Sequence, residues 1–289
     1  MKKNNIVFAF FGTSVFSVII LDELKAHGLV PALIVTVEDK PKDRKLIMTP
    51  PEVKIWAEKE RVPFIQPKTL KNDEVAGIIK KYSPDGFDVF IVASYGKIIP
   101  ENLLNIPRRG TLNIHPSLLP RLRGASPVQS AILNETETGV TIIKLDKEMD
   151  HGPILVQQKA HLNNWPPYAE DLEKILAKMG GKLLVEILPN WISGKTEEKE
   201  QNHSDATHSK KIEKSDGELN MNDSADENLR KIRAYHIWPG AYFFDTSRGK
   251  QKRIIVKTAH LTDENLILDR IIPEGKREMN YKDYVNGKK

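Results

Sequence analysis

The chain has 289 residues, enough for one large or two modest domains, and it contains no cysteine. The lack of cysteine excludes a disulfide framework, a Cys-ligated metal centre and a thiol nucleophile, and it fits a reducing compartment. The formal net charge of +5 permits an anionic partner, and no apolar run approaches the ~20 residues that span a bilayer, so we expect a cytoplasmic protein without a membrane segment.

Strand and helix patterns alternate through the first two thirds of the chain. Residues 87–93 and similar apolar runs lack the alternation of a half-exposed strand and therefore predict buried strands. The expected strands lie at residues 6–11, 29–37, 62–65, 87–93, 110–115 and 139–145. The expected helices lie at residues 15–24, 53–59, 77–82 and 168–188. This pattern predicts a Rossmann-like, mainly parallel α/β sheet with helices on both faces and a ligand crevice at the carboxyl ends of its strands.

The pattern changes in the last third of the chain. Residues 193–228 hold too few apolar side chains for a core, and we interpret them as linker and surface. A short amphipathic helix at 226–235 is followed by strands without crossover helices, which predicts a small β-rich domain. These strands are expected at residues 241–245, 253–259 and 266–272. The expected domains are residues 1–192 (catalytic), 193–208 (linker) and 209–289 (β-rich).

Gly12 follows the first predicted strand, where a dinucleotide-binding protein has its glycine fingerprint. The G-x-G-x-x-G spacing and the P-loop are both absent, which disfavours NAD or ATP binding through these motifs. A tight turn is enough to explain this glycine. The histidines have neither H-E-x-x-H nor H-x-x-x-H spacing, so we expect no metal site.

Asn113 and His115 lie two residues apart at the end of a predicted strand, so their side chains project from the same face. An Asn amide can polarise a carbonyl, and a His ring can transfer a proton or stabilise an oxyanion. The simpler interpretation is that both residues only satisfy the strand end. Pro116, Pro120 and Pro127 bracket a stiff, non-helical segment beside them, which favours the wall of a ligand cleft.

Charged residues follow the predicted strand at 139–145. A carboxylate in this segment can approach His115, orient its ring and favour its charged form. Asp150 is our candidate. Asp146, Lys147 and Glu148 are equally charged neighbours, so spacing alone does not single out Asp150.

Two basic clusters lie where turns or strand edges are expected. The first contains Lys40, Lys42, Arg44 and Lys45. The second contains Arg248, Lys250, Lys252, Arg253 and Lys257. Both permit an anionic partner, and the alternative is an ordinary solvated basic face.

These motifs together resemble the 10-formyltetrahydrofolate-dependent formyltransferases. The resemblance is carried by Asn113-x-His115, by S-L-L-P-R-x-R-G-A-x-P at residues 117–127 and by the D-x-G turn at Asp150. It spans most of the chain through further similar segments at residues 11–14, Arg44, 93–96 and 233–241. The W-P-G-A segment within the last of these and the basic second domain favour members that act on methionyl-tRNA over those that act on glycinamide ribonucleotide or sugar nucleotides.

The resemblance implies transfer of the formyl group of 10-formyltetrahydrofolate to the α-amino group of methionine on initiator tRNA. It implies that Asn113 and His115 stabilise the tetrahedral oxyanion and that Asp150 sets the state of His115. Which of His115 and Asp150 removes the amine proton stays open. The folate-binding residues that it implies are Ser117, Leu118, Leu119, Pro120, Ala93, Tyr95 and Gly96. The tRNA-binding residues that it implies are Arg44, Lys40, Lys42, Lys45, Arg248, Lys250, Lys252 and Arg253.

The resemblance also implies a C-terminal OB-like β-barrel that binds tRNA. Because the chain is short after residue 259, we expect an abridged barrel that ends in a helix-forming segment at 279–284. We expect a monomer that uses no metal. Two other functions stay open: formyl transfer to an amino-sugar nucleotide, and a non-catalytic RNA-binding role.

Overall fold

The structure is a computed structural model that describes residues 6–42, 46–71, 73–247, 250–263 and 265–287. Its contacts divide the chain into two compact units. Unit 1 comprises Met1–Arg123, Gly139–Ala160 and Lys174–His208, and unit 2 comprises Gly124–Thr138, His161–Glu173 and Ser209–Lys289. The expected domain boundaries at residues 192 and 208 stay a prediction. Two internal segments, Gly124–Thr138 and His161–Glu173, are grouped by their contacts with the C-terminal part of the chain and belong to unit 2.

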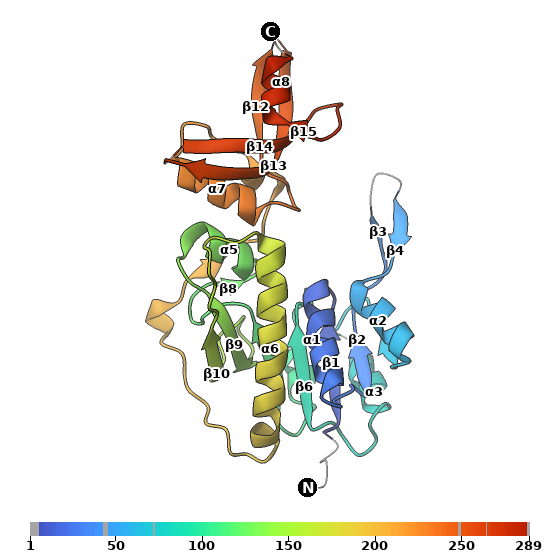
Figure 1. Ribbon diagram of the computed structural model, residues 1–289. Helices are drawn as coiled ribbons and strands as arrows, with labels where there is room; N and C mark the ends of the chain where they lie inside the picture. Colours follow the sequence, from blue (N-terminus) through green and yellow to red (C-terminus); the bar gives the residue numbers. More distant parts are fainter. Residues whose placement is uncertain (1–5, 43–45, 72, 248–249, 264, 288–289) are drawn as a thin grey trace. The chain divides into compact units, whose positions relative to one another are not determined.

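Unit 1 is built on a seven-stranded sheet with the order β10-β9-β7-β6-β1-β2-β5 (Figure 1). The strands are β1 (Phe8–Gly12), β2 (Leu33–Val35), β5 (Phe64–Ile65), β6 (Val89–Ala93), β7 (Thr111–His115), β9 (Gly139–Lys144) and β10 (Ile154–Lys159). Pairing is parallel from β7 through β6, β1 and β2 to β5, and antiparallel between β7 and β9 and between β9 and β10. The predicted mainly parallel α/β fold is therefore confirmed.

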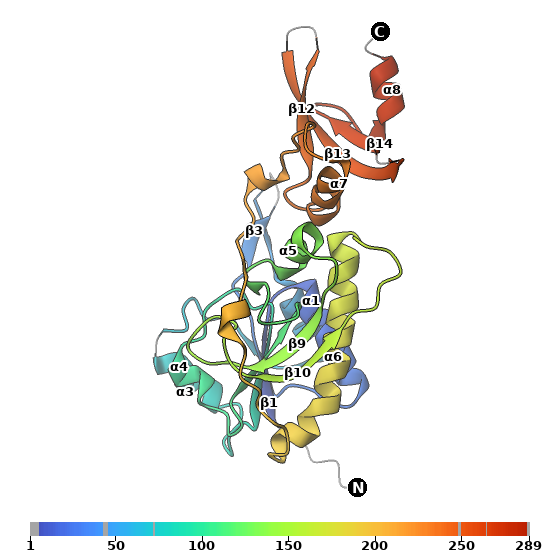
Figure 2. The ribbon, with the colours of Figure 1, turned by 90° about the vertical axis from the view of Figure 1, so that its left-hand side faces the viewer.

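Helices cover both faces of this sheet. They are α1 (Val15–Ala26), α2 (Glu52–Glu60), α3 (Asp73–Lys80), α4 (Glu101–Leu104) and α6 (Ala169–Ile192). The sheet lies between the layer of α1 and α6 and the layer of α3 and α4 (Figure 2). Gly180 of α6 comes so close to β7 that a Cβ on it would lie 2.5 Å from Ile114 Cγ2. None of the described helices has both the length and the apolar composition needed to cross a membrane.

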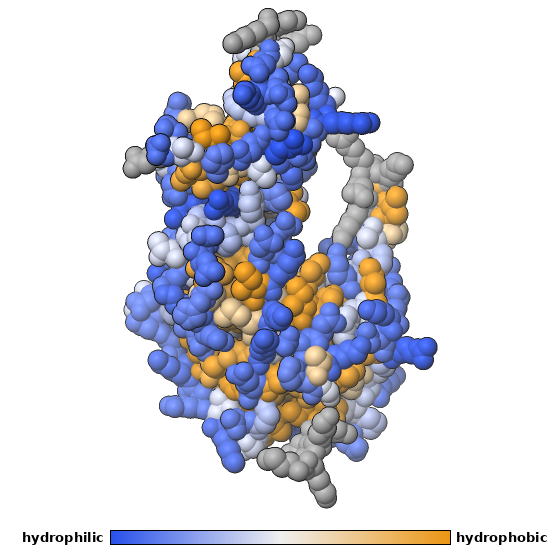
Figure 3. All heavy atoms as spheres, viewed as in Figure 1, coloured by the Kyte–Doolittle hydropathy of each residue, from blue (hydrophilic) through white to orange (hydrophobic). Residues whose placement is uncertain are grey.

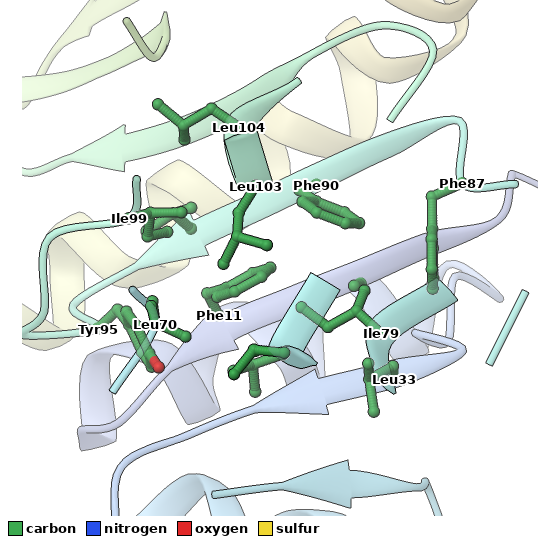
Figure 4. Packing of buried hydrophobic residues seen from close by; sticks show 14 of the residues in the cluster. Phe11, Leu33, Leu70, Ile79, Phe87, Phe90, Tyr95, Ile99, Leu103 and Leu104 are labelled. Carbon is green, nitrogen blue, oxygen red and sulfur yellow. The ribbon is translucent and has the colours of Figure 1, made fainter. Parts of the chain in front are cut away.

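Aromatic side chains fill the core on one face of the sheet (Figure 4). Phe11 of β1 and Phe90 of β6 are fully buried, with their ring centroids 5.2 Å apart. Tyr95, just after β6, packs edge-on against Phe11 at 5.5 Å. All side chains of β1 and β6 are buried, which explains why these strands lack an apolar–polar alternation.

The carboxyl ends of β1, β6 and β7 lie side by side. Gly12 pairs with Ala93, and Val92 pairs with Asn113. The chain runs from β1 outward through β2 and β5 and then returns to β6 on the other side of β1, so the strand order reverses at the β1–β6 pair. In open α/β sheets, ligands bind at such a reversal.

Unit 2 contains a four-stranded antiparallel sheet with the order β12-β13-β14-β15. Its elements are α7 (Ala225–Ala234), β12 (Tyr242–Ser247), β13 (Lys250–Thr262), β14 (Asn265–Pro273), β15 (Met279–Asn280) and α8 (Tyr281–Asn286). The predicted helix and strands are confirmed, and Leu229 and Ile232 of α7 share a core with Ile254 of β13. In the described part of unit 2 no pairing joins β12 to β15, so this small β domain is an open sheet.

Several elements had no clear sequence signal. They are β3 (Lys40–Lys42), β4 (Ile47–Thr49), β8 (Arg123–Gly124), α5 (Pro127–Asn134), β11 (His208–Ser209), β10, α4 and short 3-10 helices at His203–Asp205 and Lys214–Gly217. β3 and β4 form a hairpin, and Leu46, Ile47 and Met48 on it are exposed. Figure 3 shows this hairpin as an apolar spot on a mostly polar face. The interpretation of residues 193–228 as surface is wrong at five buried residues, Gln201, Ser209, Gly217, Leu219 and Asn228.

Gly12 owes its place to close packing, because a Cβ there would lie 2.6 Å from Phe10 Cε1 and 2.8 Å from Ser17 Cβ. We predict that Gly12→Ala lowers the free energy of unfolding by roughly 1–3 kcal/mol, the usual effect of overpacking. Gly77 is the matched control, since it lies in α3 and a Cβ there meets nothing within 4 Å. Gly77→Ala should stabilise the protein by roughly 0.5–1 kcal/mol. Urea unfolding of both variants measures the difference, and equal stability would contradict the packing role.

Candidate active site

Asn113, His115 and Asp150 lie together at the carboxyl end of β7. Asn113 Nδ2 donates a hydrogen bond of 3.3 Å to Asp150 Oδ1. His115 Nδ1 lies 3.6 Å from the same oxygen. His115 and Asp150 are buried, and Asn113 is half-buried. One carboxylate oxygen thus faces both side chains of the strand end.

The acidic neighbours of Asp150 face elsewhere. Asp146 Oδ2 lies 2.7 Å from His151 Nδ1, and Glu148 Oε2 lies 3.9 Å from His151 Nε2. Among the alternatives that the sequence left open, Asp150 is the carboxylate that the structure brings to His115.

Asp150 occupies the left-handed backbone region, with φ of +51°. A residue with a side chain pays roughly 1–3 kcal/mol for such a conformation and keeps it only where the surroundings hold it. The backbone here turns sharply after β9, and this turn directs the Asp150 carboxylate to β7. Ser94 and Leu122, in the segments that follow β6 and β7, also have positive φ (+48° and +61°). Left-handed residues with side chains often cluster at functional sites.

The ring of His115 is held on both sides. Its Nε2 lies 3.0 Å from the main-chain oxygen of Leu122. A carbonyl oxygen can only accept, so Nε2 carries the hydrogen of this bond. The remaining nitrogen, Nδ1, lies 3.6 Å from Asp150 Oδ1.

The segment at residues 117–120 is fixed by hydrogen bonds to β9. Thr141 Oγ1 donates to the oxygen of Ser117 at 2.7 Å and accepts from the nitrogen of Leu119 at 3.1 Å. Ser117 Oγ donates to the oxygen of Arg121, and the Leu119–Pro120 peptide is cis. Ser117 and Leu119 are buried, and Leu118 and Pro120 are half-buried. This segment is a rigid wall beside His115.

The segment at residues 93–96 combines buried side chains with an exposed glycine. Ala93 is buried, and its oxygen accepts from Ser17 Oγ at 2.6 Å. The ring of Tyr95 lies in the core, and burial raises the pKa of its hydroxyl. Gly96 is exposed with φ of +79°, and a Cβ on it would meet nothing within 4 Å. The main chain at Gly96 is therefore uncovered.

The basic clusters are described only in part. Arg44, Lys45 and Arg248 lie outside the described residues, as do the side chains of Lys42 and Lys250. Lys40 on β3 and Lys252 on β13 are exposed. Arg253 instead stacks on the ring of Tyr242, with its guanidinium carbon 3.7 Å from the centroid.

The second cluster does not form a single face. Successive residues of a strand point to opposite sides, and β13 pairs with β12 without a register shift from Lys250 to Ile255. Lys252 and Arg253 therefore do not share a face. Among the described residues, no three His, Cys, Asp or Glu side chains form a group that could hold a metal ion.

No sequence pattern pointed to the segment at residues 201–207, which contacts the site although it lies far from it along the chain. Thr207 Oγ1 accepts from the nitrogen of Leu122 at 2.9 Å, next to the carbonyl that holds His115. Gln201 bonds to the turn of Asp150. The few apolar side chains of residues 193–228 led us to expect a linker at residues 193–208, which contain both Gln201 and Thr207.

Comparison with known proteins identifies relatives. The sequence matches the family Formyl transferase over residues 4–188 and the family Formyl transferase, C-terminal domain, over residues 211–266. A methionyl-tRNA formyltransferase of Thermotoga maritima is 43% identical over 236 residues, which are 81% of this chain and 74% of that protein. One of Thermodesulfovibrio yellowstonii is 35% identical over 302 residues, with 97% and 95% covered.

A solved structure has the same fold. HypX from Aquifex aeolicus in complex with tetrahydrofolic acid matches with a TM-score of 0.65 and 14% identity, covering 99% of this chain and 48% of that one. At this identity the likeness concerns the fold alone.

Proposed function

Because the chain belongs to the formyl transferase family, with methionyl-tRNA formyltransferases among its relatives, we propose that Asn113, His115 and Asp150 catalyse its reaction. The enzyme transfers the formyl group of 10-formyltetrahydrofolate to methionyl-tRNA, which gives N-formylmethionyl-tRNA for translation initiation. The observation that carries the assignment of the site is the convergence of Asn113 and His115 on Asp150 Oδ1.

The family uses a formyl donor bound to tetrahydrofolate, which is a co-substrate that supplies the electrophilic formyl carbon when bound. The chemistry of the crevice fits such a ligand. Uncovered main chain at Gly96 offers hydrogen-bonding groups to a flat ring, and the segment at 117–120 is a rigid wall beside the catalytic group. We assign Ser117, Leu118, Leu119 and Pro120 to that wall, and the main chain of Ala93, Tyr95 and Gly96 to the opposite side.

Formyl transfer places negative charge on the formyl oxygen and releases a proton from the attacking amine. The Asn113 amide has two N–H groups, and the one that does not bond to Asp150 can donate to that oxygen. His115 can take the amine proton at Nδ1, because Nε2 carries the hydrogen bonded to Leu122 and Nδ1 is the ring nitrogen left to accept, 3.6 Å from Asp150 Oδ1. The proton then passes to the folate nitrogen as the bond between that nitrogen and the formyl carbon breaks, which releases tetrahydrofolate and the formylated amine.

The exposed basic residues are assigned to tRNA. The side chains of Lys40 and Lys252 are exposed and can contact phosphate groups. Arg44 and Arg248 belong to the same two clusters in the sequence. Lys42, Lys45, Lys250 and Arg253 complete the proposed set. Phosphate contacts of this kind position the tRNA without reading its bases. We further propose that the enzyme acts as a monomer in the cytoplasm.

Asp150→Asn tests the role of the Asp150 charge in catalysis. Asp150→Asn keeps the size of the side chain and removes the charge that faces His115, so kcat should fall by about 100-fold or more while both KM values change little. Asp146→Asn is the matched control. The Asp146 carboxylate faces His151 rather than His115, so the same substitution there should leave kcat unchanged. The assay measures formylation of methionyl-tRNA. Loss of folate binding with an unchanged kcat would make Asp150 a ligand anchor instead.

Lys252→Glu tests the proposed contact with tRNA. Lys252→Glu should raise the KM for methionyl-tRNA and lower the slope of log KM against log salt by about 1 per lost phosphate contact. The KM for the formyl donor should stay constant, because Lys252 is not among the residues that we assign to folate binding. Lys182→Glu, an equal charge change at an exposed position of α6, is the control. An unchanged tRNA KM and salt slope in Lys252→Glu would move the tRNA site elsewhere.

A further inference from the structure

A buried amide and a buried guanidinium lie behind the catalytic turn. Gln201 and Arg123 are each only 5% exposed. Gln201 Oε1 accepts hydrogen bonds from Arg123 Nε at 3.2 Å and from Arg123 Nη2 at 2.7 Å. Gln201 Nε2 donates to the main-chain oxygen of Asp150 at 2.9 Å and to that of Gly152 at 2.7 Å. One side chain therefore joins both ends of the turn that contains Asp150.

This turn has little room to adopt another shape. Asp150 is left-handed, and a Cβ on Gly152 would lie 1.9 Å from the main-chain oxygen of Lys144. The direction of the Asp150 carboxylate follows from the backbone that carries it. Hydrogen bonds that fix the carbonyls of Asp150 and Gly152 therefore also fix where Oδ1 points.

Arg123 determines which way the amide faces. A guanidinium has only donors, so the oxygen of Gln201 must face Arg123 and the NH₂ group must face the two carbonyls. Arg123 is itself fixed, because its main-chain nitrogen donates to Thr207 and its Nη2 lies 2.9 Å from His203 Nδ1. The amide is thus held in one orientation, with both of its hydrogens used.

The same pair links the two partners of His115. Arg123 directly follows Leu122, whose carbonyl binds His115 Nε2, and Gln201 holds the turn whose carboxylate faces His115 Nδ1. Both sides of the ring are therefore connected through one buried hydrogen-bond network. A shift of the network by a fraction of an ångström would move Asp150 relative to His115.

We infer that Gln201, oriented by Arg123, is a positioning residue for formyl transfer: it holds the Asp150 turn so that Oδ1 stays within reach of Asn113 and His115. This rests on the proposed function, because Gln201 acts through Asp150 alone. Without its N–H donors the turn relaxes, and the carboxylate moves away from the ring. Substrate binding, which uses other residues, is unaffected.

Gln201→Glu is the most informative variant. It keeps the size of the side chain and the acceptor for Arg123, and in its charged form it removes the donors to Asp150 and Gly152. We expect kcat to fall roughly 10- to 100-fold, the loss that follows a small misplacement of a reacting group, with both KM values near those of the parent. Gln201→Met removes the same donors without adding charge and should lower kcat similarly. It replaces Gln201→Glu in the test if the charged variant folds poorly.

A double-mutant cycle separates positioning from a general structural role. In the Asp150→Asn background, Gln201→Glu should cost less than twofold further in single-turnover rate, because the group that it positions is already gone. A full multiplicative loss would overturn the inference. If Asp150→Asn keeps the parental rate, the proposed function fails; if Asp150→Asn is slow and both Gln201 variants keep the parental kcat, only the inference fails.

Asn228 provides the matched control. It is a buried amide of unit 2 whose Nδ2 donates to the carbonyls of Asn220 at 2.9 Å and of Asp223 at 3.4 Å. Asn228→Asp removes the same kind of donors and should lower thermal stability with kcat unchanged. An equal fall of kcat in Asn228→Asp and Gln201→Glu would show that stability alone sets the rate, which overturns the positioning role.

Discussion

The active-site geometry depends on one carboxylate oxygen, Oδ1 of Asp150, which both Asn113 Nδ2 and His115 Nδ1 approach. The sheet supplies one half of this arrangement, because β7 lies between β6 and β9 and its register fixes where its last residues stand. The left-handed turn supplies the other half. A non-glycine residue keeps a left-handed backbone only where surrounding contacts hold it there. The groups that hold the turn are therefore as much a part of the site as the carboxylate.

Donors to main-chain carbonyls, rather than apolar contacts, hold this turn and the neighbouring wall. Gln201 reaches the carbonyls of Asp150 and Gly152, and Thr141 reaches that of Ser117. Such contacts need a few well-placed polar side chains and no hydrophobic pattern. A single polar side chain of an otherwise largely exposed segment, Gln201, can therefore be buried behind an active site without contributing to a hydrophobic core.

The features that the sequence predicted correctly are those with a local pattern, such as apolar strands and residues spaced along one strand. Strands β1, β6 and β7 are apolar runs, and the two-residue spacing of Asn113 and His115 places them on one face of β7. By contrast, β10 escaped prediction because its second half is exposed and polar. α5 was missed because Pro127, which is the first residue of this helix, was interpreted as the end of a non-helical segment. Gln201 had no local signal at all, since its partners lie 51 and 78 residues away. The choice of Asp150 over Asp146 depends on a turn conformation that spacing does not encode.

The central claim is that Asn113 and His115 act as one catalytic unit around Asp150. Single-turnover formylation of methionyl-tRNA by Asn113→Ala, His115→Ala and the double variant, at saturating 10-formyltetrahydrofolate and tRNA, tests it most directly. Each single change should lower the rate by about 100-fold or more, and the double variant should be little slower than the slower single variant, because residues that work as a unit are not additive. Near-parental turnover in either single variant, with the fold intact, would contradict the account.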